Sequence, residues 1–396
     1  MRTRGNLKTH KVKKDPYQIL LRLSGILAIT VVVGFGIFFL CRTLIQNEHV
    51  SRFEALQKQN IEAEQEFTAQ MNALRASHEA ANMPQEIEEE TGERPVWEKE
   101  IDGSLWRIEY AGRGGLENVS VMTMERAALI NGGLLLVNEW HSLPYDFSDA
   151  ELLGVGATSG YKIQVTDSSV RLMPAAYDGL AALIADAETA GLKDYIVREG
   201  YRTNDEQTEM FTKVQDKLSK DYSGDILIAQ TKKQVNYPGT SDYQSGMSFR
   251  MDLYPLPKGV KFQQSDQGKW FTENAWKQGV AIRFPTADFP NANWEDKSYK
   301  TGVSVAMNLY RYVGKAHAVS MRIMDYCLEE YVEFLQNYSH VCIYQDGALR
   351  YEVVRIPATE ELQSYDVPVP NPASGFQASF DNMGGIVMAY TYSEAQ

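Results

Sequence analysis

The sequence predicts an α+β fold, in which helices and strands follow one another without a regular order. Residues 174–191 have the three- and four-residue apolar spacing of an amphipathic helix. Residues 341–356 alternate like two strands on either side of Asp346-Gly347, a dipeptide typical of hairpin turns. No strand–helix–strand repeat connects these segments, which argues against a doubly wound parallel sheet.

The start of the chain has the features of a membrane anchor. Residues 1–18 form a short basic tail, and Leu23–Cys41 is an apolar run without charges. At about 1.5 Å per residue such a run can cross a hydrocarbon core of about 30 Å. We therefore predict a transmembrane helix over residues 19–43 of a single-pass cell-membrane protein. Its N-terminus should be cytoplasmic, because basic flanks stay inside, and its ectodomain extracytoplasmic. A cleaved signal peptide is the alternative, but bulky residues stand where small ones should mark a cleavage site.

Residues 44–95 are predicted to form a helical stalk followed by an acidic linker. Residues 44–81 lack Pro and Gly and carry a weak heptad pattern, which leaves a dimeric coiled coil open. Residues 86–93 are mostly acidic and lie between two prolines. The whole chain has a net charge of −13, so nothing in its electrostatics favours nucleic acid as a partner.

The folded part is predicted to begin near Trp97 and to have three regions. These are a hairpin region at 96–133, a core at 134–358 and a strand-rich extension at 359–396. The expected elements are a hairpin over Ile101–Tyr110, a buried strand at Leu134–Asn138, a strand at Tyr195–Val197, a helix capped by Thr203 or Asn204, a helix over 269–279 followed by a strand at 280–284, and one long helix over Ala318–Asn337. Whether Cys327 and Cys342 pair is left open.

Six segments, in a fixed order, resemble the motifs of one enzyme family. They are Leu136-Val137-Asn138 with Leu143-Pro144, Glu199-Gly200-Tyr201-Arg202 with Gln207, Pro238 to Gly246, Trp270 to Pro285, Arg311-Tyr312-Val313-Gly314 with His317, and Ser379 to Gly385. Together they resemble the VanY-like zinc D-alanyl-D-alanine carboxypeptidases, which trim the terminal D-alanine from peptidoglycan stem peptides. The resemblance implies a zinc D,D-carboxypeptidase core of the Hedgehog/D,D-peptidase-like type. It also implies a stem peptide or a cell-wall protein as partner.

The resemblance further implies a zinc ion held by His, Asp and His, with a Glu as general base. Here Tyr243 and Leu309 stand at the two His positions and Ala306 at the Glu position. Asp252 is the candidate for the Asp ligand, although strict motif spacing leads to Arg250. Leu cannot ligate zinc and Ala cannot accept a proton. We therefore predict a catalytically impaired homologue, a pseudoenzyme, without a zinc cofactor.

The positions that contact substrate in the family are better preserved. Arg202, Gln207 and Ser241 match them, and an arginine can hold a carboxylate through paired, charge-assisted hydrogen bonds. Glu199 replaces a Ser of the motif and could neutralise Arg202. Together with the anchor predicted from the apolar run, the resemblance implies a membrane-anchored, extracytoplasmic, D-alanyl-D-alanine carboxypeptidase-like protein related to peptidoglycan stem peptides.

Two alternatives stay open at this point. One is an active metallopeptidase with zinc in a rebuilt site, for instance Asp252, Asp242 and His317. The other is a fold reused for contact with another protein, without any small ligand.

Overall fold

The computed structural model describes residues 95–396 except 113–115, 257, 291–293, 359, 372 and 394–396. The predicted basic tail, transmembrane helix and coiled-coil stalk lie outside these residues. No helix in the described ranges combines the length and the apolar character needed to cross a membrane. The described residues belong to one compact unit.

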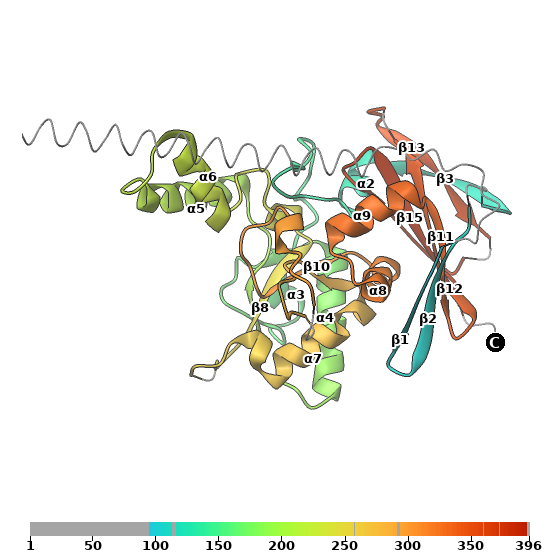
Figure 1. The fold of residues 1–396 in the computed structure, drawn as a ribbon, viewed down its shortest axis with the longest axis horizontal. Coiled ribbons are helices and arrows are strands. Elements are labelled where there is room, and N and C mark those ends of the chain that lie inside the picture. The colour runs from blue at the N-terminus through green and yellow to red at the C-terminus, as the bar shows by residue number, and fades with distance from the viewer. Residues whose placement is uncertain are drawn as a thin grey trace, which may run out of the picture. The chain divides into compact units, whose positions relative to one another are not determined.

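The larger sheet is antiparallel, with the strand order β1-β2-β11-β12-β15-β14 (Figure 1). Its strands are β1 (Val96–Ile101), β2 (Ser104–Tyr110), β11 (His340–Gln345), β12 (Ala348–Pro357), β14 (Gly375–Phe380) and β15 (Gly385–Thr391). Both predicted hairpins are confirmed. Asp102-Gly103 and Asp346-Gly347 all have positive φ, as a tight two-residue turn between twisted strands requires. The sheet contains strands from all three predicted regions, namely the hairpin region, the core and the C-terminal extension.

Helices cover one face of this sheet and a small second sheet covers part of the other. On the first face, α8 (Lys315–Met324) and α9 (Leu328–Asn337) pack against the buried side chains of Val341, Ile343 and Val353. On the second face lie α2 (Arg126–Ile130) and the antiparallel pair β3 (Val119–Glu125) and β13 (Ser364–Pro370). That cover extends over β12, β15 and β14.

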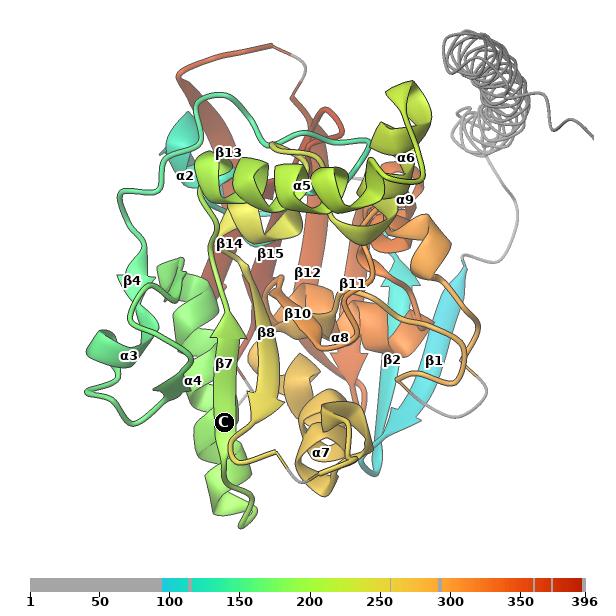
Figure 2. The ribbon, with the colours of Figure 1, turned by 90° about the vertical axis from the view of Figure 1, so that its left-hand side faces the viewer.

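A five-stranded sheet forms the second half of the unit, in the order β5-β7-β8-β10-β9 (Figure 2). Its strands are β5 (Gln164–Val165), β7 (Tyr195–Glu199), β8 (Ser248–Leu253), β10 (Leu309–Tyr312) and β9 (Val280–Ile282). Only the short pair β5–β7 is parallel. The predicted helix at 174–191 is confirmed as α4 (Pro174–Thr189), and with α7 (Asp266–Asn274) it buries one apolar face on this sheet.

The remaining elements lie outside these two sheets. They are β4 (Leu153–Gly154), β6 (Arg171–Leu172), α3 (Val155–Thr158), α5 (Asn204–Leu218), α6 (Gly224–Gln234), η1 (Asp242–Ser245), η2 (Phe262–Gln264), η3 (Ala275–Gln278) and η4 (Ser298–Lys300). The predicted cap of α5 is Thr203, whose hydroxyl accepts a hydrogen bond from the Glu206 amide. The Thr203 amide in turn donates a hydrogen bond to the Glu206 carboxylate, which completes a capping box.

Two predicted elements are wrong. Leu134–Asn138 is buried but is not a strand. Instead its backbone accepts hydrogen bonds from a side chain, since Arg311 Nη2 lies 2.7 Å from the Leu135 carbonyl oxygen. The single helix expected over Ala318–Asn337 is two helices. Asp325 adopts a left-handed conformation that ends α8, and Cys327 then caps α9.

The two described cysteines are free thiols. Cys327 is buried at the start of α9, whereas Cys342 lies on β11 and is partly exposed. The question of their pairing, which the sequence leaves open, is thereby answered.

A buried ionic network joins the two halves of the unit. Arg311 on β10 donates from Nη1 to the Asp242 carboxylate at 2.6 Å, and Arg283 Nε lies 3.2 Å from the same group. Arg283 also forms two bonds to Glu329 on α9, at 2.6 and 3.0 Å. Asn138 completes the set by donating to Glu329 at 2.9 Å. Two cations thus face two anions in the interior, so no buried charge is left uncompensated.

Candidate functional site

Arg202 and Gln207, which the motifs predict to contact substrate, follow the end of β7 in the sequence. A Cβ atom at Gly200 would lie 2.4 Å from the Arg171 carbonyl oxygen, so the close approach of these two chain segments requires glycine. Tyr201 continues the contact, because its amide donates to the same carbonyl at 2.8 Å. The turn ends at the cap of α5, and Arg202 projects from it.

Arg202 already has three partners. It pairs with the Glu199 carboxylate, donates from Nη1 to Gln207 Oε1 at 3.1 Å, and lies with its Cζ 4.0 Å above the centre of the Tyr243 ring. Gln207 is itself held by the Asn236 carbonyl oxygen, at 2.6 Å from its Nε2. The structure therefore brings the predicted residues Arg202 and Gln207 together. It also confirms that Glu199 neutralises the arginine.

Glu199 is the centre of this cluster. Besides Arg202, its carboxylate pairs with Arg250 Nη2 at 3.0 Å, and it is hydrogen-bonded to the Tyr243 side chain. Burial and then the Glu199 charge raise the pKa of Tyr243 above its usual range. The phenol is consequently protonated at neutral pH and donates to Glu199. Ser241 is buried just before η1, two residues from Tyr243.

The strand register decides which residue stands beside Leu309. The Cα partner of Leu309 across β10 and β8 is Arg250, and Arg250 is in turn the partner of Glu199 on β7. Asp252 lies two residues further along β8, opposite Ile196. Its carboxylate pairs with Arg198 at 3.4 Å. The residue that strict motif spacing selects, Arg250, is therefore the one that stands next to Leu309, and Asp252 is not.

These residues do not fit a zinc ion. Zinc in proteins takes thiolate, imidazole or carboxylate donors. Here the corresponding positions hold a protonated phenol at Tyr243, a cationic guanidinium at Arg250 and a hydrocarbon side chain at Leu309. Ala306 provides no proton acceptor at the general-base position. A guanidinium paired with Glu199 takes the place that the motif gives to an acidic ligand.

The rebuilt metal site considered from the sequence is not formed either. Asp242 is buried and committed to Arg311, Arg283 and Ser248. His317 lies on α8, packed against α9, with Nδ1 2.9 Å from the Tyr331 hydroxyl. Neither side chain reaches Asp252, which pairs with Arg198 on β7. The structure does not bring Asp252, Asp242 and His317 together.

The buried imidazole gives a prediction about pH. Full burial lowers the pKa of His317 to about 3, from an ordinary value of 6.5. Its contribution to stability is therefore complete above pH 6.5 and is lost as the pH falls towards 3, because the unfolded chain takes up a proton first. Between pH 7.5 and 5.5 this loss is about 1.4 kcal/mol of unfolding free energy. Urea unfolding at both pH values should show that much greater loss in the wild type than in His317→Gln, and equal losses would contradict the prediction.

A hollow of about 320 Å³ opens beside Arg202. Its lining carries charges of both signs, namely Asp167, Arg198, Glu199, Arg202, Glu206, Glu209 and Lys213. Arg198 lines this hollow but was not among the residues assigned from the motifs, although strict motif spacing did lead to Arg250. Its place directly before Glu199 in the sequence could have located it.

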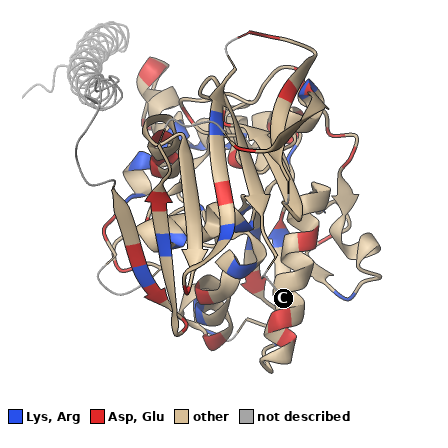
Figure 3. Cartoon of the chain, turned by 90° about the vertical axis from the view of Figure 1, so that its right-hand side faces the viewer, with Lys and Arg blue, Asp and Glu red and all other residues tan. Residues whose placement is uncertain are grey.

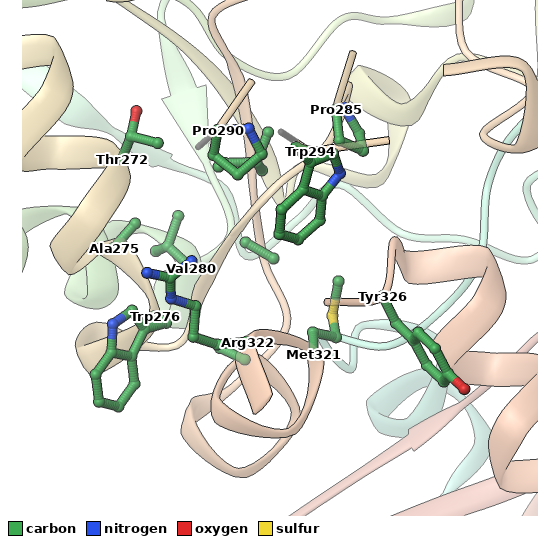
Figure 4. A pocket seen from close by; sticks show the side chains of 13 residues that line it. Thr272, Ala275, Trp276, Val280, Pro285, Pro290, Trp294, Met321, Arg322 and Tyr326 are labelled. Carbon is green, nitrogen blue, oxygen red and sulfur yellow. The ribbon is translucent and has the colours of Figure 1, made fainter. Parts of the chain in front are cut away.

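A second, smaller pocket has a different character (Figure 4). It is lined mainly by apolar and aromatic side chains, among them Trp276 of η3, Met321 of α8, and Trp294 and Tyr326 from segments outside the helices and strands. Arg322 is the only charged residue among the thirteen described residues that line it. Apart from the Tyr326 phenol it has no acid–base group, and it has no carboxylate, imidazole or thiol to bind a metal, so the charged hollow is the better candidate.

The comparisons with known proteins agree with the motifs. Residues 169–315 match the VanY family, described as D-alanyl-D-alanine carboxypeptidase. The chain is 25% identical over 280 residues to a D-alanyl-D-alanine carboxypeptidase of Enterococcus faecium, which covers 69% of this chain and 80% of that protein. It is 30% identical over 217 residues to a D-alanyl-D-alanine carboxypeptidase of Enterococcus faecalis, which covers 54% of this chain and 71% of that protein.

The fold has a counterpart among solved structures. The vancomycin-resistance D,D-dipeptidase VanXYg, in complex with a D-Ala-D-Ala phosphinate analogue, matches with a TM-score of 0.54 at 22% identity. The match covers 69% of this chain and 99% of that chain. A core of mixed helices and strands, like that of the D,D-peptidases, is thereby confirmed.

Proposed function

Because the chain belongs to the VanY family of D-alanyl-D-alanine carboxypeptidases, we propose that it is a cell-wall-related member that binds peptidoglycan stem peptides without hydrolysing them. The observation that carries this proposal is the Glu199–Arg250 ion pair beside Leu309. Within it Arg250 takes the strand position where the family motif has an acidic metal ligand, and Leu309 opposite it takes the position of a histidine ligand.

The loss of hydrolysis follows from the chemistry of the site. A zinc-bound water is the nucleophile in such enzymes, and a positioned carboxylate contributes about 10²–10⁴-fold as general base. With Tyr243, Arg250 and Leu309 at the ligand positions and Ala306 at the base position, neither group is supplied. We therefore expect no turnover, rather than slow turnover.

The binding half of the proposal rests on Arg202 and Gln207. The relatives are named for their action on D-Ala-D-Ala, and VanXYg was solved with an analogue of that dipeptide. Arg202 borders the charged hollow and can turn towards a peptide carboxylate. Glu199 competes for the same guanidinium. A single charge-assisted pair contributes about 1.5–3 kcal/mol, and a millimolar dissociation constant corresponds to about 4 kcal/mol, so binding through this pair is expected to be millimolar or weaker.

The proposal includes the location of the protein. The basic tail and the apolar run at residues 19–43 support a single membrane anchor with the folded part outside, where peptidoglycan lies. The weak heptads of residues 44–81 support a stalk that could pair two copies.

The test uses the purified full-length protein and a stem pentapeptide that ends in D-Ala-D-Ala. We expect no release of D-alanine with added zinc, and no change with a chelator. Titration followed by NMR should show millimolar or weaker binding that is lost in Arg202→Ala. Because Glu199 competes with the ligand, Glu199→Gln should tighten binding.

Arg107→Ala is the matched control, since this arginine lies on β2 of the other sheet and should leave binding unchanged. Chelator-sensitive release of D-alanine would overturn the proposal that hydrolysis is lost. Absence of both release and binding would overturn the proposal of peptide recognition and would favour a role in protein–protein contact.

A further inference from the structure

Three potential metal ligands lie together on the larger sheet, away from the family site. They are His340 and Cys342 on β11 and Glu352 on β12, and one ligand atom of each lies within 4.8 Å of the other two. In the part of the chain that the structure describes, this is the only group of three His, Cys, Asp or Glu side chains with such spacing. The mixture of imidazole, thiol and carboxylate distinguishes it from a solvated acidic cluster.

Strand register explains why these three side chains meet. Cys342 and Glu352 are Cα partners across β11 and β12, so they point to the same face, and His340 lies two residues before Cys342 on that face. The intervening residue Val341 points the other way, into the core under α8 and α9. A bulge between Ile343 and Tyr344 shifts the register by one residue. Without this bulge, the hairpin would place Tyr351 opposite Cys342.

The face that carries the group is the one turned away from α8 and α9. Figure 3, which views the molecule from the side of this sheet, shows acidic and basic residues interspersed along the strands. The side chains of His340 and Glu352 are nevertheless mostly buried, with 11% and 13% of their surface exposed. Their neighbours therefore hold them in place, while a small ion can still reach the edge of the group.

We propose that His340, Cys342 and Glu352 form a binding site for a divalent transition-metal ion of the zinc or cobalt type. Thiolate and imidazole donors select such ions over magnesium or calcium, which prefer oxygen ligands alone. At usual bond lengths of about 2.0–2.3 Å, tetrahedral ligand atoms are about 3.4–3.6 Å apart. The three ligand atoms, which lie within 4.8 Å of one another, must shift by about 1 Å to reach this spacing. The fourth position is left to water.

Binding requires two proton changes. His340 Nε2 and Glu352 Oε1 are now 2.6 Å apart and share a proton, which the ion must replace. In a neutral imidazole this proton moves from Nε2 to Nδ1, which frees Nε2 to bind the ion, and the Cys342 thiol releases its own proton to solvent. Metal affinity should accordingly fall as the pH is lowered.

A second set of contacts orients the carboxylate. The Tyr392 hydroxyl donates to Glu352 Oε2 at 2.5 Å, which leaves Oε1 directed towards His340 and Cys342. Such outer hydrogen bonds fix ligand geometry in metal sites, and their loss weakens binding by about 10–100-fold. Tyr392→Phe should therefore weaken binding by that factor without removing a ligand.

The experiment is a titration of the metal-free full-length protein with Co²⁺, followed by absorption spectroscopy, and then with Zn²⁺ as competitor. We expect one Co²⁺ per chain, with a thiolate-to-cobalt charge-transfer band in the near ultraviolet that Zn²⁺ abolishes. The band should disappear in Cys342→Ser, and the affinity should fall at least tenfold in His340→Gln and in Glu352→Gln.

Cys327→Ser provides the matched control. It removes the other described thiol while keeping a good cap for α9, so it should fold and retain the band. A wild-type protein without the band, or a band that survives in Cys342→Ser, would overturn the proposal. Because the family site is not involved, Arg202→Ala should leave the titration unchanged.

Discussion

Replacement of Arg311 by methionine is expected to lower the unfolding free energy by about 3–5 kcal/mol, because it breaks a buried ion pair and leaves its partners behind. Arg311 is fully buried, and its guanidinium bonds Asp242, Ser245 and the carbonyl oxygens of Gly133 and Leu135. Methionine can fill part of the space but satisfies none of these groups. Urea unfolding of Arg311→Met and of the wild type measures the difference.

The control is an arginine of the same charge at the surface. Arg107 pairs with Glu109 at 2.6 Å, but its side chain is 45% exposed. Exposed pairs contribute about 0–1 kcal/mol, so Arg107→Met should change stability little. Similar losses in the two variants would show that the buried network does not carry the stability assigned to it.

Restoration of the family ligands is expected to create a zinc site at the position that the family motifs define. The variant carries Tyr243→His, Arg250→Asp, Leu309→His and Ala306→Glu, together with Glu199→Ser so that the new carboxylate at 250 does not face another one. When the free zinc concentration is 100 times the dissociation constant, zinc binding stabilises a folded protein by about 2.7 kcal/mol. The unfolding temperature should therefore rise with zinc, and D-alanine release should appear.

This variant is best made in a Cys342→Ser background, since zinc on the larger sheet would otherwise contribute to the same signal. A companion that keeps Ala306 should still bind zinc but release D-alanine about 10²–10⁴-fold more slowly. If the folded variant bound no zinc, the alignment of Leu309 and Arg250 with the motif positions would be wrong.

The sequence was sufficient for the elements that local signals define. The Asp-Gly dipeptides predicted both hairpins of the larger sheet, and a cap at Thr203 or Asn204 predicted the start of α5, where the structure has Thr203. It was insufficient where tertiary contacts decide. The apolar run at Leu134–Asn138 has the composition of a strand, but buried hydrogen bonds from Arg311 replace those of a sheet. The break at Asp325 has no glycine or proline to announce it.

The candidate site was predictable in part for a similar reason. Arg202 and Gln207 could be found from a contiguous motif, because they lie on one turn and the helix that follows it. The choice between Arg250 and Asp252 needed the register of three strands, and a bulge between Val197 and Glu199 on β7 shifts that register. A bulge also determines that Glu352 faces Cys342. Such irregularities depend on packing, which no residue spacing reveals.

The pairing of β2 with β11 has a consequence for how the protein folds during its synthesis. Val341 pairs with Tyr110, so the two strands that complete the middle of the larger sheet are made near opposite ends of the folded region. While the chain is being synthesised, the core around Trp106 and Ile108 stays incomplete until α8 and β11 have been made. Long-range pairing of this kind folds slowly and leaves apolar surface exposed in the meantime. A chain that terminated before β11 would therefore keep this apolar surface exposed and would be a substrate for proteolysis.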